Sequence, residues 1–106
     1  MNKSLFVALL ATGCFGASPA ERARAADIAS LAADPSRGRD LYLEACAVCH
    51  GDLGEGASGP DLADASALDA DEVVLLLMWG PRSMPSFETW PDQDLADVTS
   101  WVREGR

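Results

Sequence analysis

The sequence is short of basic residues and of long apolar segments. Lysine and arginine together number 8 against 17 acidic residues, the formal net charge is −9, and Lys3 is the only lysine. Phosphate groups repel so acidic a chain, which argues against nucleic acid and against an anionic membrane surface as partners. The continuous apolar runs over residues 5–11 and 73–79 are each too short to cross a bilayer as a helix, so no membrane span is expected.

Histidine and cysteine are also scarce, and this limits the metal chemistry that the chain can support. A structural zinc site needs four ligands, commonly arranged as two separated pairs. Cys46, Cys49 and the single histidine, His50, stand together, and no second pair exists. A thioredoxin-like dithiol site belongs in a βαβ context, and no strand pattern precedes these cysteines. A zinc site and a dithiol redox site therefore stay as the weaker alternatives.

Cys46-Ala47-Val48-Cys49-His50 has the spacing CxxCH, which in an exported chain is the attachment site of a c-type haem. Residues three apart on a helical turn share a face, so both thiols can add to the vinyl groups of one porphyrin. His50 then falls where an imidazole nitrogen reaches the iron. The motif predicts one haem c, covalently held by Cys46 and Cys49, with His50 as an axial iron ligand.

The N-terminus has the pattern of a secretory signal peptide. Lys3 supplies a positive charge before the apolar run, and several small residues follow that run. We expect residues 1–20 to be the signal peptide, with cleavage after Ala20 or after Ala25. The chain is therefore predicted to be exported to the periplasm of a bacterium.

Two further expectations concern the segment around and after the signal peptide. Residues 10–14 resemble a bacterial lipobox, so an alternative is that Cys14 is lipidated and gives the protein a lipid anchor. Residues 21–33 are rich in alanine and charge, a pattern that can form a frayed helix or a tether, and we expect them to be a linker. The folded domain is then expected over residues 34–106.

The domain carries signals for helices and none that favours strands. Asp34 before a proline predicts the N-terminus of a helix that runs into the CxxCH motif. Asp69, with a glutamate three residues later, predicts a capping box for a helix over residues 70–79. A last helix is predicted over residues 91–103, where apolar residues recur at helical spacing. These patterns indicate an all-α fold.

Met84 is the candidate for the second axial ligand of the iron. It lies in an irregular segment between two prolines, and Pro85 keeps its backbone out of a helix. A thioether is a soft, neutral ligand that suits haem iron opposite an imidazole. No histidine or lysine follows as a competing ligand. Met78, within the apolar helix, is predicted to be a core residue, and Trp79 is predicted to line the haem pocket.

Together these motifs resemble the class I c-type cytochromes of bacteria, over about Ala33 to Arg106. In chain order the motifs are Gly38-x3-Tyr42-x3-Cys46-x2-Cys49-His50-Gly51, Gly59-Pro60-Asp61-Leu62, Met84-Pro85-x-Phe87 and Trp101 in an acidic last helix. The resemblance implies a small cytochrome c fold, with three to four helices packed around one covalently bound haem. It also implies that the Pro60 carbonyl accepts the N–H of His50, and that Gly38 lets the first helix cross the last beside Trp101.

The resemblance implies a one-electron carrier between a donor such as a dehydrogenase and an acceptor such as an oxidase. If His50 and Met84 both ligate the iron, no position is open for a substrate, so the protein is not expected to be an enzyme. Its partners are expected to be other redox proteins, bound transiently by a monomer. Two alternatives stay open, namely a haem-based sensor of small ligands that displace Met84, and a cytochrome subunit of a dehydrogenase complex.

Overall fold

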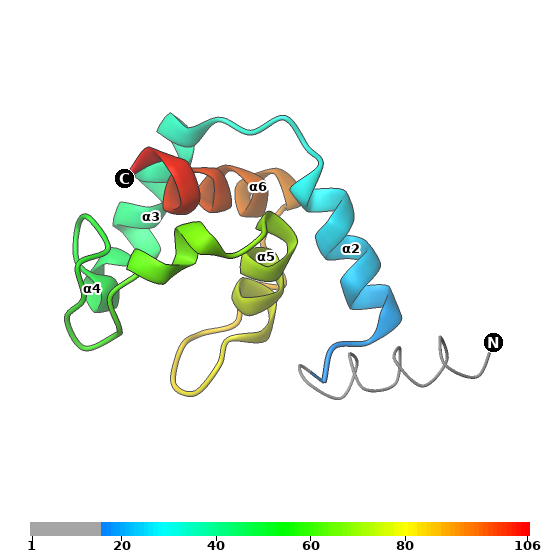
Figure 1. The fold of residues 1–106 in the computed structure, drawn as a ribbon, viewed down its shortest axis with the longest axis horizontal. Helices are drawn as coiled ribbons and strands as arrows, with labels where there is room; N and C mark the ends of the chain where they lie inside the picture. Colours follow the sequence, from blue (N-terminus) through cyan, green and yellow to red (C-terminus); the bar gives the residue numbers. More distant parts are fainter. Residues whose placement is uncertain (1–15) are drawn as a thin grey trace.

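The computed structural model describes residues 16–106, so the apolar run of the expected signal peptide and Cys14 lie outside the described residues. The elements in chain order are α2 (Pro19–Ala29), α3 (Pro35–Ala45), α4 (Ala47–His50), the 3-10 helix η1 (Ala63–Ala67), α5 (Ala70–Trp79), α6 (Asp92–Ser100) and the π-helical end η2 (Trp101–Gly105), shown in Figure 1. Residues 16–106 contain no strand, which confirms the expected all-α class. None of the helices in this range is long and apolar enough to span a membrane.

The capping residues that the sequence predicts cap α3 and α5 in the structure. Asp34 caps α3, and its carboxylate accepts two backbone N–H groups of the first turn at 3.0 and 3.3 Å. The Glu72 carboxylate accepts the backbone N–H of Asp69 at 3.0 Å, as a capping box requires. Gly80 ends α5 with a left-handed φ of 68°, which a glycine adopts without strain. The first helix differs from the expectation, because it ends at Ala45 and the CxxCH motif forms a separate short helix.

The crossing of α3 over α6 and η2 forms one half of the core (Figure 1). Gly38 lies at the crossing, where a Cβ would collide with the backbone carbonyl of Asp97 and lie 3.1 Å from the Trp101 Cβ. A glycine is therefore needed for the two backbones to approach this closely.

A buried carboxylate fixes the same crossing. Asp97 is 1% exposed and accepts hydrogen bonds from the Asp34 backbone N–H and the Gln93 amide, both at 2.8 Å, and from Arg37 at 3.2 Å. Burial alone raises the pKa of Asp97, but these hydrogen bonds outweigh it and the pKa is lowered. The charged carboxylate thus ties the start of α3 to α6.

Tyr42 links this crossing to the CxxCH motif. Its side chain is fully buried, its ring centroid lies 4.4 Å from that of Trp101, and its hydroxyl donates to the carbonyl of Gly51 at 2.6 Å. Burial raises the pKa of Tyr42 to about 12. The residue that follows His50 is therefore held by the core that α3 and the last helix build.

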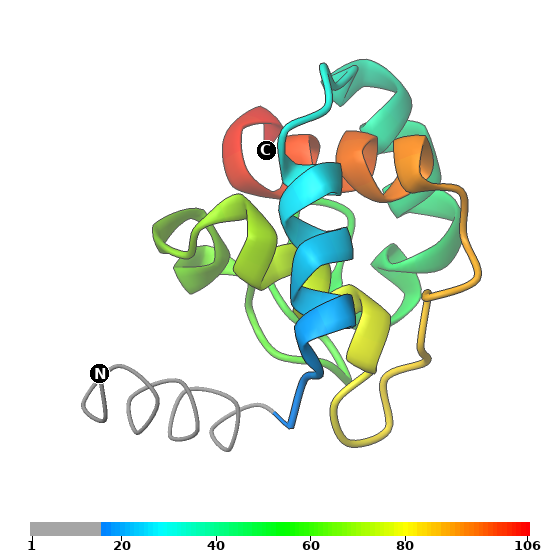
Figure 2. The same cartoon turned by 90° about the vertical axis from the view of Figure 1, so that its right-hand side faces the viewer.

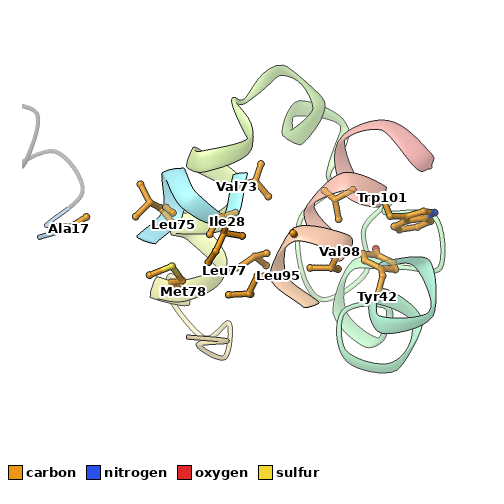
Figure 3. Close-up of a cluster of buried hydrophobic side chains, with 14 residues drawn as sticks. Ala17, Ile28, Tyr42, Val73, Leu75, Leu77, Met78, Leu95, Val98 and Trp101 are labelled. Carbon is orange, nitrogen blue, oxygen red and sulfur yellow. The ribbon is translucent and has the colours of Figure 1, made fainter. Parts of the chain in front are cut away.

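The second half of the core lies between α2 and α5. Figure 3 shows Ile28 beside Leu77, whereas Tyr42 and Trp101 lie together at the other end of the cluster. Ala25 and Ile28 are 0% and 1% exposed, and α2 packs against α5 and also contacts α6 (Figure 2). Burial of this kind stabilises a helix too short to persist alone in water.

The structure therefore differs from the linker that we expected over residues 21–33. Ser18 caps α2, because its hydroxyl accepts the Glu21 N–H at 3.1 Å while the Glu21 carboxylate accepts the Ser18 N–H at 2.9 Å. The sequence contains this capping box, but its apolar pattern does not reveal the helix. Only Ala25 and Ile28 form the fully buried face of α2, and the other residues of the helix are mainly alanine and charged residues.

Gly38→Ala is predicted to destabilise the holoprotein by about 1–3 kcal/mol, the usual cost of overpacking a close contact. The new methyl group has to push the backbone of Asp97 away from α3. Denaturant unfolding followed by circular dichroism measures the change. Asp40→Ala, on the exposed side of α3, is the matched control, and equal unfolding midpoints for the two variants contradict the prediction.

Tyr42 is predicted to titrate near 12 in the folded protein and near about 10 in denaturant. The raised pKa means that its contribution to stability is complete below a pH of about 10 and is lost as the pH rises through the folded value. Because the chain has 1 tyrosine, ultraviolet difference absorbance of the phenolate reports this residue alone. Tyr42→Phe is the blank, and a native titration near about 10 contradicts the burial argument.

Candidate haem site

The CxxCH motif occupies the junction of α3 and α4. The Cys46 N–H still donates to the Tyr42 carbonyl at 2.8 Å, while the N–H groups of Cys49 and His50 donate back to the Cys46 carbonyl at 3.2 and 3.0 Å. One tight turn therefore separates the two cysteines, as expected. Both are free thiols, with Cys46 half-buried and Cys49 exposed. Burial raises the pKa of the Cys46 thiol to about 11, so it is neutral at physiological pH.

His50 is oriented by a hydrogen bond to the loop that follows it. Its Nδ1 lies 2.8 Å from the carbonyl oxygen of Pro60. A carbonyl only accepts, so Nδ1 carries the proton and Nε2 keeps the lone pair that a metal ligand needs. The bond that the family resemblance implies is thus present, and it prepares the imidazole to ligate iron through Nε2.

The loop over residues 51–62 is folded tightly against the motif. The Gly59 N–H donates to the Cys49 carbonyl at 2.6 Å, and a Cβ on Gly59 would lie 3.0 Å from Cε1 of His50. The absence of a side chain lets the backbone pass this close to the ring. From the far side, the Arg106 guanidinium donates to the Leu62 carbonyl at 2.7 Å. The Pro60 carbonyl is therefore held in place from both directions.

Met84 lies in the loop over residues 80–91, which both views place on the same side of α6 as the 51–62 loop (Figures 1 and 2). Its N–H donates to the Pro81 carbonyl at 3.1 Å, and its side chain is half-buried against the core. Arg82 adopts a left-handed φ of 56°, which is unusual outside glycine and tightens the turn. Met84 is thus displayed on an irregular, compact loop, as the flanking prolines predicted.

Large apolar side chains are exposed on the segments that carry the candidate ligands. Trp79, at the end of the otherwise buried α5, is 58% exposed, Val48 in α4 is 80% exposed, and Leu53 in the following loop is 63% exposed. Exposed apolar side chains on or beside these segments are available to cover a flat apolar cofactor. Trp79 was predicted as a pocket residue. Val48 and Leu53 were not, because a sequence does not reveal which apolar residues stay out of the core.

These side chains fit a haem better than a bare metal ion. Within residues 16–106, no group of three or more His, Cys, Asp or Glu side chains is gathered as a metal site. The porphyrin supplies four ligands of its own, so the protein has to provide only axial donors and an apolar surface. An oriented imidazole, a thioether, two neighbouring thiols and exposed apolar side chains are the groups that such a cofactor needs.

Comparison with known proteins points to the same cofactor. Residues 33–102 match the family model described as cytochrome c oxidase, cbb3-type, subunit III. The chain is 31% identical over 78 residues to a cytochrome c-553-like protein of Synechocystis sp., covering 72% of this chain and 73% of that protein. It is 32% identical over 73 residues to cytochrome c-551 of Bacillus subtilis, covering 68% of this chain and 64% of that protein.

A solved structure shares the fold. Cytochrome cL from the marine methylotrophic bacterium Methylophaga aminisulfidivorans superposes with a TM-score of 0.56 at 27% identity, over 64% of this chain. The present chain spans 50% of the length of that cytochrome. The matched family span runs from just before α3 into η2, and it includes the CxxCH motif and the Met84 loop. The chain therefore belongs to the cytochrome c oxidase, cbb3-type, subunit III family, as a class I c-type cytochrome that carries one covalently bound haem c.

Proposed function

We propose that this electron-transfer protein is a periplasmic one-electron carrier whose haem is attached through Cys46 and Cys49 and whose iron is ligated by His50 and Met84. The observation that carries the proposal is the 2.8 Å bond between His50 Nδ1 and the Pro60 carbonyl. It gives the only histidine of the chain the tautomer and orientation of an axial ligand.

The haem, when bound, supplies an iron that takes up and gives back one electron. The chain's own residues set how readily this happens. The Met84 thioether would favour ferrous iron and so raise the reduction potential, while the hydrogen bond that His50 Nδ1 donates to the Pro60 carbonyl would make the imidazole a better ligand. Trp79 covers part of the apolar surface of the site. If His50 and Met84 both hold the iron, no position would be left open for a substrate.

The periplasm is the proposed location. The charge and apolar run of the first residues support export, and residues 1–20 carry no acid, so their removal takes away Lys3 alone and changes the net charge from −9 to −10. A lipid anchor at Cys14 stays the alternative way of keeping the exported protein at a membrane.

Transient contacts with other redox proteins suit a carrier of this kind, which we propose to be monomeric. An acidic protein is steered electrostatically toward basic surfaces, and this affects the rate of encounter more than the affinity. A dehydrogenase as donor and an oxidase or another cytochrome as acceptor are the proposed partner classes. A permanent place as the cytochrome subunit of a dehydrogenase complex is the alternative, and stable co-purification with the enzyme distinguishes it.

Met84→Leu is predicted to leave the haem covalently attached while abolishing the weak far-red band from methionine to ferric iron. The reduction potential should fall by on the order of 100 mV, a fraction of the roughly 0.8 V over which axial ligands set haem potentials. Visible spectroscopy and a redox titration of the purified holoprotein measure both effects.

Met78→Leu is the matched control, because Met78 is a buried methionine of α5 and the exchange nearly conserves its volume. It should change neither the band nor the potential. If the Met84 variant keeps both, the ligand assignment is wrong. If carbon monoxide readily displaces Met84 in the reduced unmodified protein, the proposed carrier gives way to the haem-based sensor.

His50→Ala is predicted to prevent a stable holoprotein, because the chain has 1 histidine and hence no second imidazole to replace it. Haem-stained gels of periplasmic extracts measure the yield. A yield equal to that of the unmodified protein contradicts the proposed proximal ligand.

A further inference from the structure

Arg24 of α2 contacts the last residues of the 80–91 loop, which carries Met84 and which we call the methionine loop, and the start of α6. Its guanidinium donates to the Glu88 carbonyl at 2.7 Å and to the Trp90 carbonyl at 3.3 Å. It also donates to the Asp92 carboxylate at 3.1 Å from Nε and at 2.9 Å from Nη2. One side chain therefore binds two backbone carbonyls and the first residue of α6, and we call this set of contacts the Arg24 clamp.

The helix that carries Arg24, α2, is held in place by its packing. Ala25 and Ile28, which follow Arg24 along α2 by one and four residues, are 0% and 1% exposed in the core against α5. This packing holds the helix even if cleavage after Ala20 removes its Ser18 cap. A planar guanidinium on such a helix is preorganised, so little side-chain freedom is lost for each hydrogen bond that it makes.

The clamped segment has few other ties. The 80–91 loop is irregular, so the carbonyls that its own turns and the first turn of α6 leave unbound need other partners. Its middle is tied to α5, because the Ser86 hydroxyl donates to the Met78 carbonyl at 2.6 Å and the Phe87 N–H donates to the Leu77 carbonyl at 2.8 Å. Beyond Phe87, Arg24 binds two carbonyls of the segment from α2, those of Glu88 and Trp90.

Packed rings link the clamped end of the loop to the core against which Met84 also lies. The Phe87 and Trp90 rings meet edge to face with centroids 4.8 Å apart, and the Trp90 N–H donates to the Phe87 carbonyl at 3.0 Å. Met84, Phe87 and Trp90 are all half-buried against the same core. Release of residues 88–92 therefore loosens the packing that holds the Met84 side chain.

We propose that Arg24 is a positioning residue for Met84, and that α2 is an accessory helix that keeps the methionine loop closed. The proposal rests on the proposed ligation of the iron by Met84. Helix α2 lies outside the matched family span of residues 33–102, so the family match does not itself account for the clamp. It also requires that processing leaves Arg24 in place, which excludes the predicted cleavage after Ala25.

Competition with imidazole on the ferric holoprotein tests the clamp. Imidazole reaches the iron only when Met84 has left, so its apparent Kd varies inversely with the fraction of molecules whose loop is open. Arg24→Gln is expected to lower this Kd about three- to tenfold, the effect of losing one charge-assisted contact at a partly exposed site. Arg24→Lys keeps the charge but lacks the planar guanidinium, so its Kd for imidazole should lie between those of the unmodified protein and Arg24→Gln.

Arg37→Gln is the matched control. It removes another arginine from the carboxylates of α6, namely Asp94 and Asp97, but on the α3 side and away from the loop. It should lower the unfolding midpoint and change the imidazole Kd less than about twofold. Asp92→Asn removes one partner of Arg24 and should shift the Kd in the same direction as Arg24→Gln, which provides a second test if that variant folds poorly.

The outcomes separate the clamp from the proposed function. An unchanged Kd in the variants of Arg24 and Asp92, or an equal shift in Arg37→Gln, overturns the clamp while the ligand assignment stands. A wild-type spectrum without the methionine band, identical to that of Met84→Leu, overturns both. An intact mass of the exported holoprotein that begins after Ala25 overturns the clamp alone.

Discussion

The hydrogen bond from His50 to the Pro60 carbonyl is the interaction on which the site depends, because one imidazole has to serve as the proximal ligand. Much of the remaining fold holds the two partners of this hydrogen bond, His50 and Pro60, in place. Tyr42 connects the residue after His50 to the crossing of α3 and the last helix. Gly59 lets the loop backbone pass beside the imidazole ring, which brings the neighbouring Pro60 carbonyl within reach of Nδ1.

Arginine side chains make many of the contacts that hold the loops and helices together, and the chain has one lysine. Arg24 binds the end of the methionine loop, Arg37 joins α3 to α6, and Arg106 binds the loop that carries Pro60. Each guanidinium reaches at least two oxygen atoms at once, which a lysine ammonium does with less geometric specificity. The two loops that carry the proposed ligand contacts are thus tied to the helices by side chains from opposite ends of the described chain.

The sequence predicted the parts of the structure that depend on local signals. The capped start of α3, the bounds of α5 and the bend at Gly80 follow from capping residues and glycine placed next to apolar runs. It failed for α2, because the helix has a small buried face and its stability comes from packing on α5. The contacts of Arg24 were also unpredicted, since they join residues that are distant in sequence.

The visible spectrum of the holoprotein, made in a host that attaches haem c and recorded oxidised and then reduced, tests the central claim most directly. Ligation by an imidazole and a thioether predicts a sharp low-spin reduced spectrum, a weak far-red methionine band in the oxidised form, and no change on adding carbon monoxide. A high-spin spectrum that shifts with carbon monoxide would contradict the account, because it would show an iron whose sixth position the protein leaves open.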